Sequence, residues 1–170
     1  EPKVSRKGDL IQTYTGKQFW PLDPRAEDVC IEDIAHALSN LCRFTGHCKE
    51  FYSVAEHCLN VSRNVPPEHA LWGLLHDASE AYLLDLARPI KKCTELSGYR
   101  ELERAIELVV CEKFGLQTTM PTEVALADVR MLATEMRQIM GPAPAKWDVD
   151  KIEPYEMSIA CHAPKTIERL

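Results

Sequence analysis

The chain has 170 residues, 45% of them hydrophobic, which is enough apolar side chain for the core of a single compact domain. Its formal charge of −6 argues against a protein that holds nucleic-acid backbone along a broad face, because that mode of binding needs clustered Lys and Arg. No apolar run is long enough to span a membrane and no secretory signal is visible, so we expect a cytoplasmic protein with no membrane partner.

The cysteines favour a reducing compartment. There are seven, an odd number, and no two of them form a C-x-x-C pair. Cys42, Cys58 and Cys111 fall within helix-like apolar patterns, where a free thiol behaves as a small hydrophobic residue. We therefore interpret the cysteines as structural rather than as a disulfide framework.

The N-terminal quarter of the chain changes from irregular to helical. Residues 1–27 mix charges and prolines around the aromatic pair Phe19-Trp20, which predicts an irregular arm held by its aromatic side chains. Apolar residues at helical spacing over 28–41 predict the first core helix, which fades near Gly46.

A capping box predicts where the next helix begins. Ser53 is followed three residues later by Glu56, and in such a box each side chain satisfies a backbone amide of the other residue. The helix should end before the Pro66-Pro67 pair, and Pro67 then opens a further helix that runs to Ala78.

The second half of the chain predicts two long helices. Residues 84–98 are expected to form a loop with one helical turn, after which apolar residues at helical spacing over 99–114 predict a helix closed by Gly115. A second long helix is expected over 121–140, and a short one over 163–170.

These elements predict an all-α fold, because no alternating β-branched runs bounded by hairpin turns are present. The expected organisation is an irregular N-terminal arm at 1–27, a helical core at 28–141 and a C-terminal extension at 142–170 packed on the same domain.

Ionisable residues interrupt two of the apolar stripes. His57 follows Val54 by three residues and precedes Val61 by four, so it lies on the inward face of its helix. Asp128 lies in the same way on the apolar stripe of the helix expected over 121–140. A buried carboxylate is costly unless it is paired or bound to a metal.

The His76-Asp77 dipeptide ends a third apolar stripe. Taken singly, an inward histidine is more often hydrogen-bonded within the core than a ligand, and an isolated His-Asp pair is usually an accident. Two imidazoles and two carboxylates from three helices, however, suit a borderline divalent ion such as Mn, Co, Fe, Ni or Zn with positions open for water. Such an ion favours hydrolysis, because it acidifies water and polarises a phosphoryl oxygen.

With these residues in this order, the chain resembles the HD-domain metal-dependent phosphohydrolases, and within them the YfbR-like 5'-deoxynucleotidases and the phage-type deoxynucleotide phosphohydrolases. The resemblance covers residues 40 to 135 and implies a helical HD bundle over 28–141 with the metal in its core. The matching segments are Arg43-Phe44, Ser53-Val54-Ala55-Glu56-His57, His76-Asp77-Ala78-Ser79-Glu80, Asp85 with Ala87-Arg88-Pro89-Ile90-Lys91, and Ala127-Asp128.

The resemblance also implies roles for the ionisable residues. One divalent transition metal ion would be held by His57, His76, Asp77 and Asp128, the residues that the helical spacing also indicates. Glu80 matches the carboxylate that orients or deprotonates the attacking water, and Asp85 matches one that handles the proton of the leaving group. Either acid alone has a second interpretation as a solvated residue at a helix end.

Further residues match the family's substrate contacts. Arg43 and Lys91 would contact phosphate, Phe44 would lie beside sugar or base, and Pro89 would line the nucleotide pocket. For Phe44, ordinary core packing is the alternative. Several members of that family place a Lys three residues before the last metal-binding Asp, where this chain has Ala125. The difference weakens the case for a triphosphate, and Arg88, Lys92 or a residue of a neighbouring subunit is the alternative source of that charge.

The expected function is hydrolysis of a phosphoester of a (deoxy)nucleotide, most simply a 5'-(deoxy)nucleoside monophosphate to nucleoside and phosphate. The alternatives are a deoxynucleoside triphosphate triphosphohydrolase, cleavage of an alarmone or cyclic nucleotide, and a non-catalytic HD nucleotide-binding module, which loss of metal ligands would mark. We expect a small nucleotide as partner, no nucleic-acid polymer, and further copies of the chain in a homo-oligomer.

Overall fold

The computed structural model describes residues 5–170, and this part of the chain is mostly helical. The α-helices are α1 (Ile31–Asn40), α2 (Val54–Arg63), α3 (Ala70–Leu75), α4 (Glu80–Leu83), α5 (Arg88–Lys91), α6 (Ser97–Phe114), α7 (Thr122–Ile139) and α8 (Pro164–Ile167). The 3-10 helices are η1 (Ala26–Asp28), η2 (Arg43–Gly46), η3 (Pro67–His69), η4 (Thr94–Leu96) and η5 (Asp148–Lys151). No helix of residues 5–170 is both long and apolar enough to cross a bilayer.

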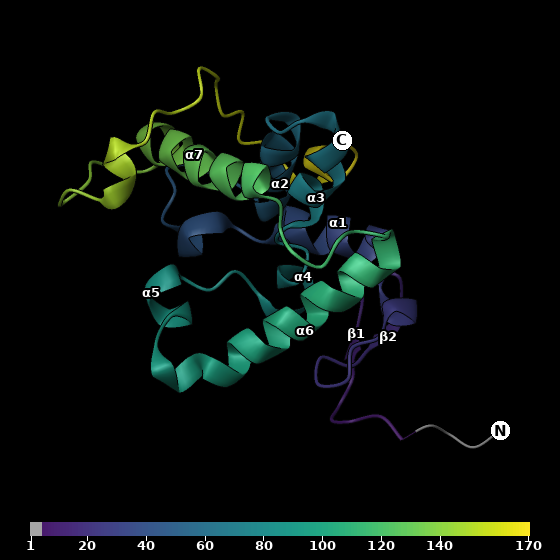
Figure 1. Ribbon diagram of the computed structural model, residues 1–170. Helices are drawn as coiled ribbons and strands as arrows, with labels where there is room; N and C mark the ends of the chain where they lie inside the picture. Colours follow the sequence, from purple (N-terminus) through teal and green to yellow (C-terminus); the bar gives the residue numbers. More distant parts are fainter. Residues whose placement is uncertain (1–4) are drawn as a thin grey trace.

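Helix α2 lies at the centre of the packing. It contacts α3, α1 and α7, while α1 also contacts α4 and α8. In the view of Figure 1, α7 lies at the top with one end beside α2 and α3, α6 crosses the lower part, and α4 lies between them. Along α2, Val54 and Cys58 belong to one buried apolar cluster and Val61 belongs to a second, so this helix joins the two halves of the core.

The start of α2 matches the sequence expectation only in part. The Ser53 side chain accepts a hydrogen bond from the backbone N–H of Glu56 at 3.1 Å, as an N-cap should. The reciprocal bond of the expected capping box is absent from the described residues. Glu56 instead accepts hydrogen bonds from the backbone N–H groups of Cys161 and His162, because its buried carboxylate faces the C-terminal residues.

The helix expected to run to Ala78 ends at Leu75, and this difference has a local cause. From Leu75 onward the backbone hydrogen bonds join residues three apart, as in the bond of 3.0 Å from Ala78 N–H to the Leu75 carbonyl. The chain therefore tightens into a 3-10-like turn over residues 76–79 before α4 begins. This turn carries the His76-Asp77 pair.

The two long helices follow the expected bounds closely. Helix α6 ends at Phe114 because Gly115 adopts a left-handed conformation with φ 67°, which a glycine tolerates without strain. Helix α7 begins after Pro121 and ends at Ile139. Short α5 and η4 occupy the expected loop over 84–98, and α8 lies within the short helix expected over 163–170.

The N-terminal arm contains a small hairpin that the sequence pattern did not indicate. Strands β1 (Ile11–Gln12) and β2 (Gln18–Phe19) pair in antiparallel register. Thr15 in the turn donates its backbone N–H and its hydroxyl to the buried carboxylate of Asp33, at 2.7 and 3.1 Å. Tertiary contact, rather than strand propensity, therefore holds these two-residue strands.

An aromatic side chain anchors the hairpin to the core, as the sequence predicted for this arm. Phe19 has no exposed surface, and its ring stacks on that of Tyr82 with centroids 3.8 Å apart. Both residues belong to the first apolar cluster, together with Ile34, Leu75 and Ile106.

Candidate metal centre

Four side chains from three segments converge beside α2. His57 Nε2 lies 3.2 Å from His76 Nε2 and 3.1 Å from Asp128 Oδ1. Asp77 Oδ2 lies 3.3 Å from His76 Nε2 and 3.8 Å from His57 Nε2. One ligand atom each of His57, His76 and Asp128 falls within a common span of 4.8 Å. The residues that the sequence singled out as ligands are thus brought together by α2, the turn after α3, and α7.

The outer ring nitrogen of each histidine has a hydrogen-bond acceptor. His57 Nδ1 lies 2.5 Å from Glu135 Oε1, and His76 Nδ1 lies 2.7 Å from the carbonyl oxygen of Gly73. Because a carbonyl oxygen only accepts, Nδ1 of His76 carries a proton, and the carboxylate favours the same arrangement in His57. The Nε2 atoms of both rings therefore face the cluster, which is the arrangement that metal-ligating histidines adopt.

Glu135 is a site residue that the sequence analysis missed. It has no exposed surface and accepts hydrogen bonds from the Tyr52 hydroxyl at 2.9 Å and from Arg43 Nε and Nη2 at 3.2 and 3.0 Å. A signal was present in the sequence, because Glu135 follows Asp128 by seven residues and so shares its face of α7.

The charges of the cluster shift the pKa values of its members in opposite directions. Burial alone would raise the pKa of Asp77, but His76, His57 and Arg43 lower it far below its usual range. Burial likewise opposes protonation of His76, yet Asp77 raises the pKa of His76 well above its usual value. The carboxylates remain ionised and electrostatically favour a positive charge between the side chains.

Arg43 lies beside the cluster, but its guanidinium is largely committed to protein partners. Two of its nitrogens bond to Glu135, and Nη1 lies 3.7 Å from Asp77 Oδ2. Burial opposes the charge on Arg43, and the neighbouring carboxylates of Glu135 and Asp77 outweigh burial and raise its pKa. The structure therefore shows Arg43 holding Glu135 and Asp77 in place.

The residues after Arg43 adopt an uncommon backbone conformation. Phe44 and Thr45 have φ of 55° and 54°, in the left-handed region that bulky and β-branched residues rarely adopt. Each such residue costs on the order of 1–3 kcal/mol. Phe44 is half-buried, and its ring centroid lies 5.3 Å from Arg43 Cζ, so the strained turn places an aromatic ring against the guanidinium.

Glu80 and Lys91 meet next to the cluster. Glu80 is 5% exposed; its Oε1 lies 3.5 Å from Lys91 Nζ, while its Oε2 has no hydrogen-bond partner among the described residues. Burial, followed by repulsion from Asp77 and Asp85, raises the pKa of Glu80 to about 9. Lys91 also pairs with Glu103 on α6, so its charge is shared between two carboxylates.

The remaining candidates lie at the margin of the site. Asp85 is half-buried, and burial raises its pKa while Arg43 and Lys91 act in the opposite direction. Pro89 is exposed in the first turn of α5, and no contact in the described chain links it to the four converging side chains. Pro89 and Phe44 are thus not among the side chains that converge in the described chain.

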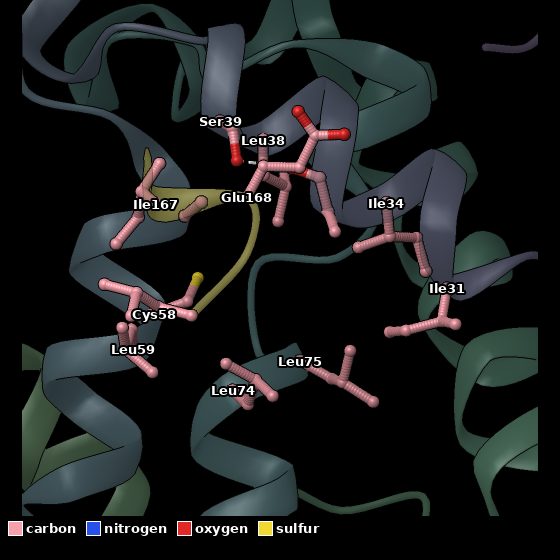
Figure 2. A pocket seen from close by; sticks show the side chains of 13 residues that line it. Ile31, Ile34, Leu38, Ser39, Cys58, Leu59, Leu74, Leu75, Ile167 and Glu168 are labelled. Atoms are coloured by element: carbon pink, nitrogen blue, oxygen red, sulfur yellow. Dashed lines mark hydrogen bonds between the residues drawn. The ribbon is translucent and has the colours of Figure 1, made fainter. Parts of the chain in front are cut away.

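A buried thiol adjoins the same cluster. Cys58 Sγ, a ring nitrogen of His76 and a carboxylate oxygen of Asp77 lie within 4.8 Å of one another. Cys58 also lines an apolar cavity of about 160 Å³ between α1, α2, α3 and the C-terminal residues. Figure 2 shows Cys58 in this cavity with Leu75 from α3 and Ile167 from α8.

Comparison with known proteins shows that the chain is similar to two bacterial proteins. No protein-family profile matches it. The YfdR protein of Escherichia coli strain K12 is 46% identical over 130 residues, which are 76% of this chain and 72% of YfdR. The chain belongs to the YfdR family. Protein RCAP_rcc00048 of Rhodobacter capsulatus is 35% identical over 147 residues, which are 79% of this chain and 74% of the relative.

Neither relative's name states an activity, so the function of this YfdR-family chain is inferred from the geometry of the site. The donor set fits a divalent cation on two grounds. Two imidazole Nε2 atoms face each other at 3.2 Å and can bind a metal once they are deprotonated, and two carboxylates lie against them. The two carboxylates stabilise positive charge between the side chains, and a divalent cation supplies that charge when it displaces the protons of the imidazoles.

Proposed function

We propose that this YfdR-family protein is a metal-dependent phosphohydrolase of the HD type that cleaves a phosphoester of a small nucleotide. The observation that supports it is the convergence of His57, His76 and Asp128, with Asp77 beside them, on one point. These four residues would hold one divalent transition ion. When bound, such an ion lowers the pKa of water and offsets negative charge on phosphoryl oxygens.

Glu135 and Gly73 act as positioning groups in this proposal. Each accepts a hydrogen bond from the outer nitrogen of one histidine and so fixes the ring orientation and the tautomer. Arg43 and Tyr52 in turn hold the Glu135 carboxylate in place. The inward direction of the two Nε2 atoms is thus set before any ligand binds, which limits the reorganisation that binding requires.

Glu80 is the proposed acid–base group. Its Oε2 is buried without a hydrogen-bond partner among the described residues, and its raised pKa allows it to take up and return a proton near neutral pH. Lys91 Nζ at 3.5 Å from Oε1 balances the charge when Glu80 is ionised. Asp85, whose pKa is also raised, would serve the leaving group.

The distribution of cations favours a monophosphate over a triphosphate. Arg43 is paired with Glu135, and Lys91 is paired with Glu103 and Glu80, so neither is a free cation for an extended phosphate chain. Ala125, which stands where several HD-domain phosphohydrolases carry Lys, is exposed. We therefore propose a 5'-(deoxy)nucleoside monophosphate as the substrate, with nucleoside and phosphate as products.

A phosphate-release screen tests this proposal. The purified chain is loaded with manganese or cobalt and incubated with nucleoside mono-, di- and triphosphates, and release of inorganic phosphate is compared with release of triphosphate. We expect phosphate from monophosphates, about one ion bound per chain, and loss of that ion in His76→Ala. Full metal retention by His76→Ala would reject the ligand assignment.

The control for chemistry is Glu80→Gln, which keeps the shape of the side chain. We expect it to retain the ion and lose at least about 100-fold in rate, the usual contribution of a positioned acid–base group. A metal-loaded protein that binds nucleotides but releases no phosphate from any of them would instead support the non-catalytic binding module.

A further inference from the structure

Cys58 is a donor that the proposed hydrolytic set does not use. It follows His57 on α2, is 1% exposed, and places its Sγ within 4.8 Å of ligand atoms of both His76 and Asp77. In residues 5–170 the metal-competent clusters are this one and the set His57, His76 and Asp128, and they have His76 in common. The same cluster of side chains therefore offers two donor sets of different chemistry.

The two sets differ in ion preference. The set with two imidazoles and two carboxylates accepts manganese, cobalt, iron, nickel or zinc without strong preference, whereas a thiolate is a soft donor that favours zinc and cadmium over the other ions. Zinc binds sulfur at about 2.3 Å and imidazole nitrogen at about 2.0–2.1 Å, so ligand atoms on neighbouring corners lie about 3.5 Å apart. Small rotations of Cys58, His76 and Asp77 bring their atoms from within 4.8 Å to that spacing.

The surroundings of Cys58 permit such rotations. The apolar cavity of about 160 Å³ borders the residue, and its wall includes Leu59, Leu74 and Leu75 (Figure 2). The space allows the side chain to shift without displacing a packed neighbour. The apolar wall also keeps water from solvating a thiolate, so a bound cation is the partner that stabilises the charged sulfur.

We propose that Cys58, His76 and Asp77 form an alternative donor set that binds zinc or cadmium and excludes the hydrolytic ion. The thiol releases its proton to solvent as the sulfur–metal bond forms. Because both sets need His76, one chain holds one ion at a time. Zinc or cadmium therefore inhibits the enzyme by competing with manganese. This inference rests on the metal centre of the proposed function.

Cadmium titration of the metal-free chain tests the donor set without any activity measurement. Cadmium bound by a thiolate gives an ultraviolet charge-transfer absorption, and we expect that band at a stoichiometry of about one ion per chain. The band should be lost in Cys58→Ser and kept in Cys111→Ser, a matched control because Cys111 is equally buried but lies in the other apolar cluster. A band that is unchanged in Cys58→Ser would overturn the proposal.

A second arm measures inhibition. Phosphate release supported by manganese is titrated with cadmium in the unaltered chain, in Cys58→Ser and in Cys111→Ser, each relative to its own uninhibited rate. We expect manganese to relieve the inhibition, and Cys58→Ser to need at least about tenfold more cadmium, which is 1.4 kcal/mol of binding free energy. Equal sensitivity of Cys58→Ser and Cys111→Ser to cadmium would contradict the assignment of Cys58 as a ligand. Binding of two cadmium ions to one chain would contradict the competition between the two donor sets.

The two arms separate this inference from the proposed function. If no nucleotide is hydrolysed but the band still depends on Cys58, the donor set stands and the hydrolase proposal falls. If manganese supports hydrolysis but the band does not depend on Cys58, the reverse holds. Should Cys58→Ser fail to fold, Cys58→Ala and the cadmium NMR shift of the unaltered chain, which reports sulfur ligation, decide the question.

Discussion

At the scale of single residues, the proposed metal centre depends on Glu135, a buried carboxylate outside the four proposed ligands. Glu135 joins His57, Arg43 and Tyr52 through hydrogen bonds and has no exposed surface. Burial would raise its pKa, but the charges of Arg43 and His57 lower it below the usual value. Glu135 therefore stays ionised and holds the imidazole of His57 with its Nε2 atom toward His76 and Asp128.

Replacing Glu135 by Gln should weaken metal binding about 10- to 100-fold, the usual effect of losing a partner of a ligating histidine. The free energy of unfolding should also fall by about 2 kcal/mol or more, because Arg43 loses its charged partner. Competition with a fluorescent chelator measures the affinity. Glu123→Gln, at an exposed position on the same helix, is the control and should change neither quantity. Unchanged affinity in Glu135→Gln would contradict a positioning role.

Glu80 predicts a pH-dependent stability in the metal-free protein. Its pKa is about 9 in the folded chain against an ordinary value of 4.5, so folding binds a proton that the unfolded chain has lost. The stabilisation is complete below pH 4.5 and is lost progressively as pH rises to 9. Glu80→Gln cannot ionise and should raise the free energy of unfolding in chelator at pH 8 by about 1–2 kcal/mol.

Urea denaturation at pH 5 and pH 8 measures this effect, and the gain should be smaller at pH 5. An equal gain at both pH values would show that packing rather than ionisation explains it. The same substitution removes the proposed acid–base group, so greater stability and lost activity should appear together, as is common where catalysis needs a strained group.

At the scale of secondary structure, the close contact of α2 and α3 depends on a glycine. A Cβ placed on Gly73 would lie 3.0 Å from the Cα of Ser62 on α2, which is backbone and cannot move aside locally. The Gly73 carbonyl also accepts the hydrogen bond from His76. Both the close packing of α2 on α3 and the orientation of the His76 imidazole thus depend on Gly73.

Gly73→Ala should destabilise the chain by about 1–3 kcal/mol because of this overlap. Gly98→Ala in α6 is the matched control, since no atom lies within 4 Å of the added Cβ there. The control should be neutral or stabilising by about 0.5–1 kcal/mol, the gain of alanine over glycine in a helix. Thermal unfolding with and without manganese compares the two; equal effects would contradict the close approach of α2 and α3.

Helix bounds were the part of the fold that the sequence predicted well. Apolar spacing and stop residues gave α6 and α7, since Gly115 and Pro121 act locally. The hairpin was missed because its strands carry little pattern and depend on distant partners such as Asp33. The end of α3 was misplaced because the apolar pattern continues through Ala78 while the hydrogen bonding changes.

The site was predictable to a similar extent. Helical spacing singled out His57 and Asp128, because a polar residue on an apolar stripe is visible in the sequence. The commitment of Arg43 to Glu135 was not predictable, since it joins residues 92 positions apart. Cys58 resembled any core cysteine, and only its proximity to His76 and Asp77 distinguishes it.

At the scale of the whole molecule, the C-terminal segment, defined as residues 152–163, packs along α7. Tyr155, Met157 and Ile159 pack against the second apolar cluster. Gln138 of α7 donates to the Met157 carbonyl at 2.7 Å and accepts from the Ile159 N–H at 3.0 Å. Side chains of α7 thus supply hydrogen bonds that an extended segment cannot make within itself.

Glu56→Ala should release the end of this segment, because the carboxylate accepts the N–H groups of Cys161 and His162 at 3.0 and 2.7 Å. We expect faster hydrogen exchange over residues 158–170 and a loss of about 1–3 kcal/mol in the free energy of unfolding. Glu153→Ala, exposed on the segment itself, is the control. Unchanged exchange in Glu56→Ala would contradict an anchoring role.

The anchor at Glu56 lies one residue before His57, and this adjacency links two properties that are usually measured separately. A ligand that binds only the native arrangement of α2 should therefore also favour the packed state of the C-terminal segment. Packing of that segment should in turn raise the affinity for the ligand by the same factor. Binding of a ligand at the cluster beside α2 should consequently slow the cleavage of the final residues of the chain by a carboxypeptidase.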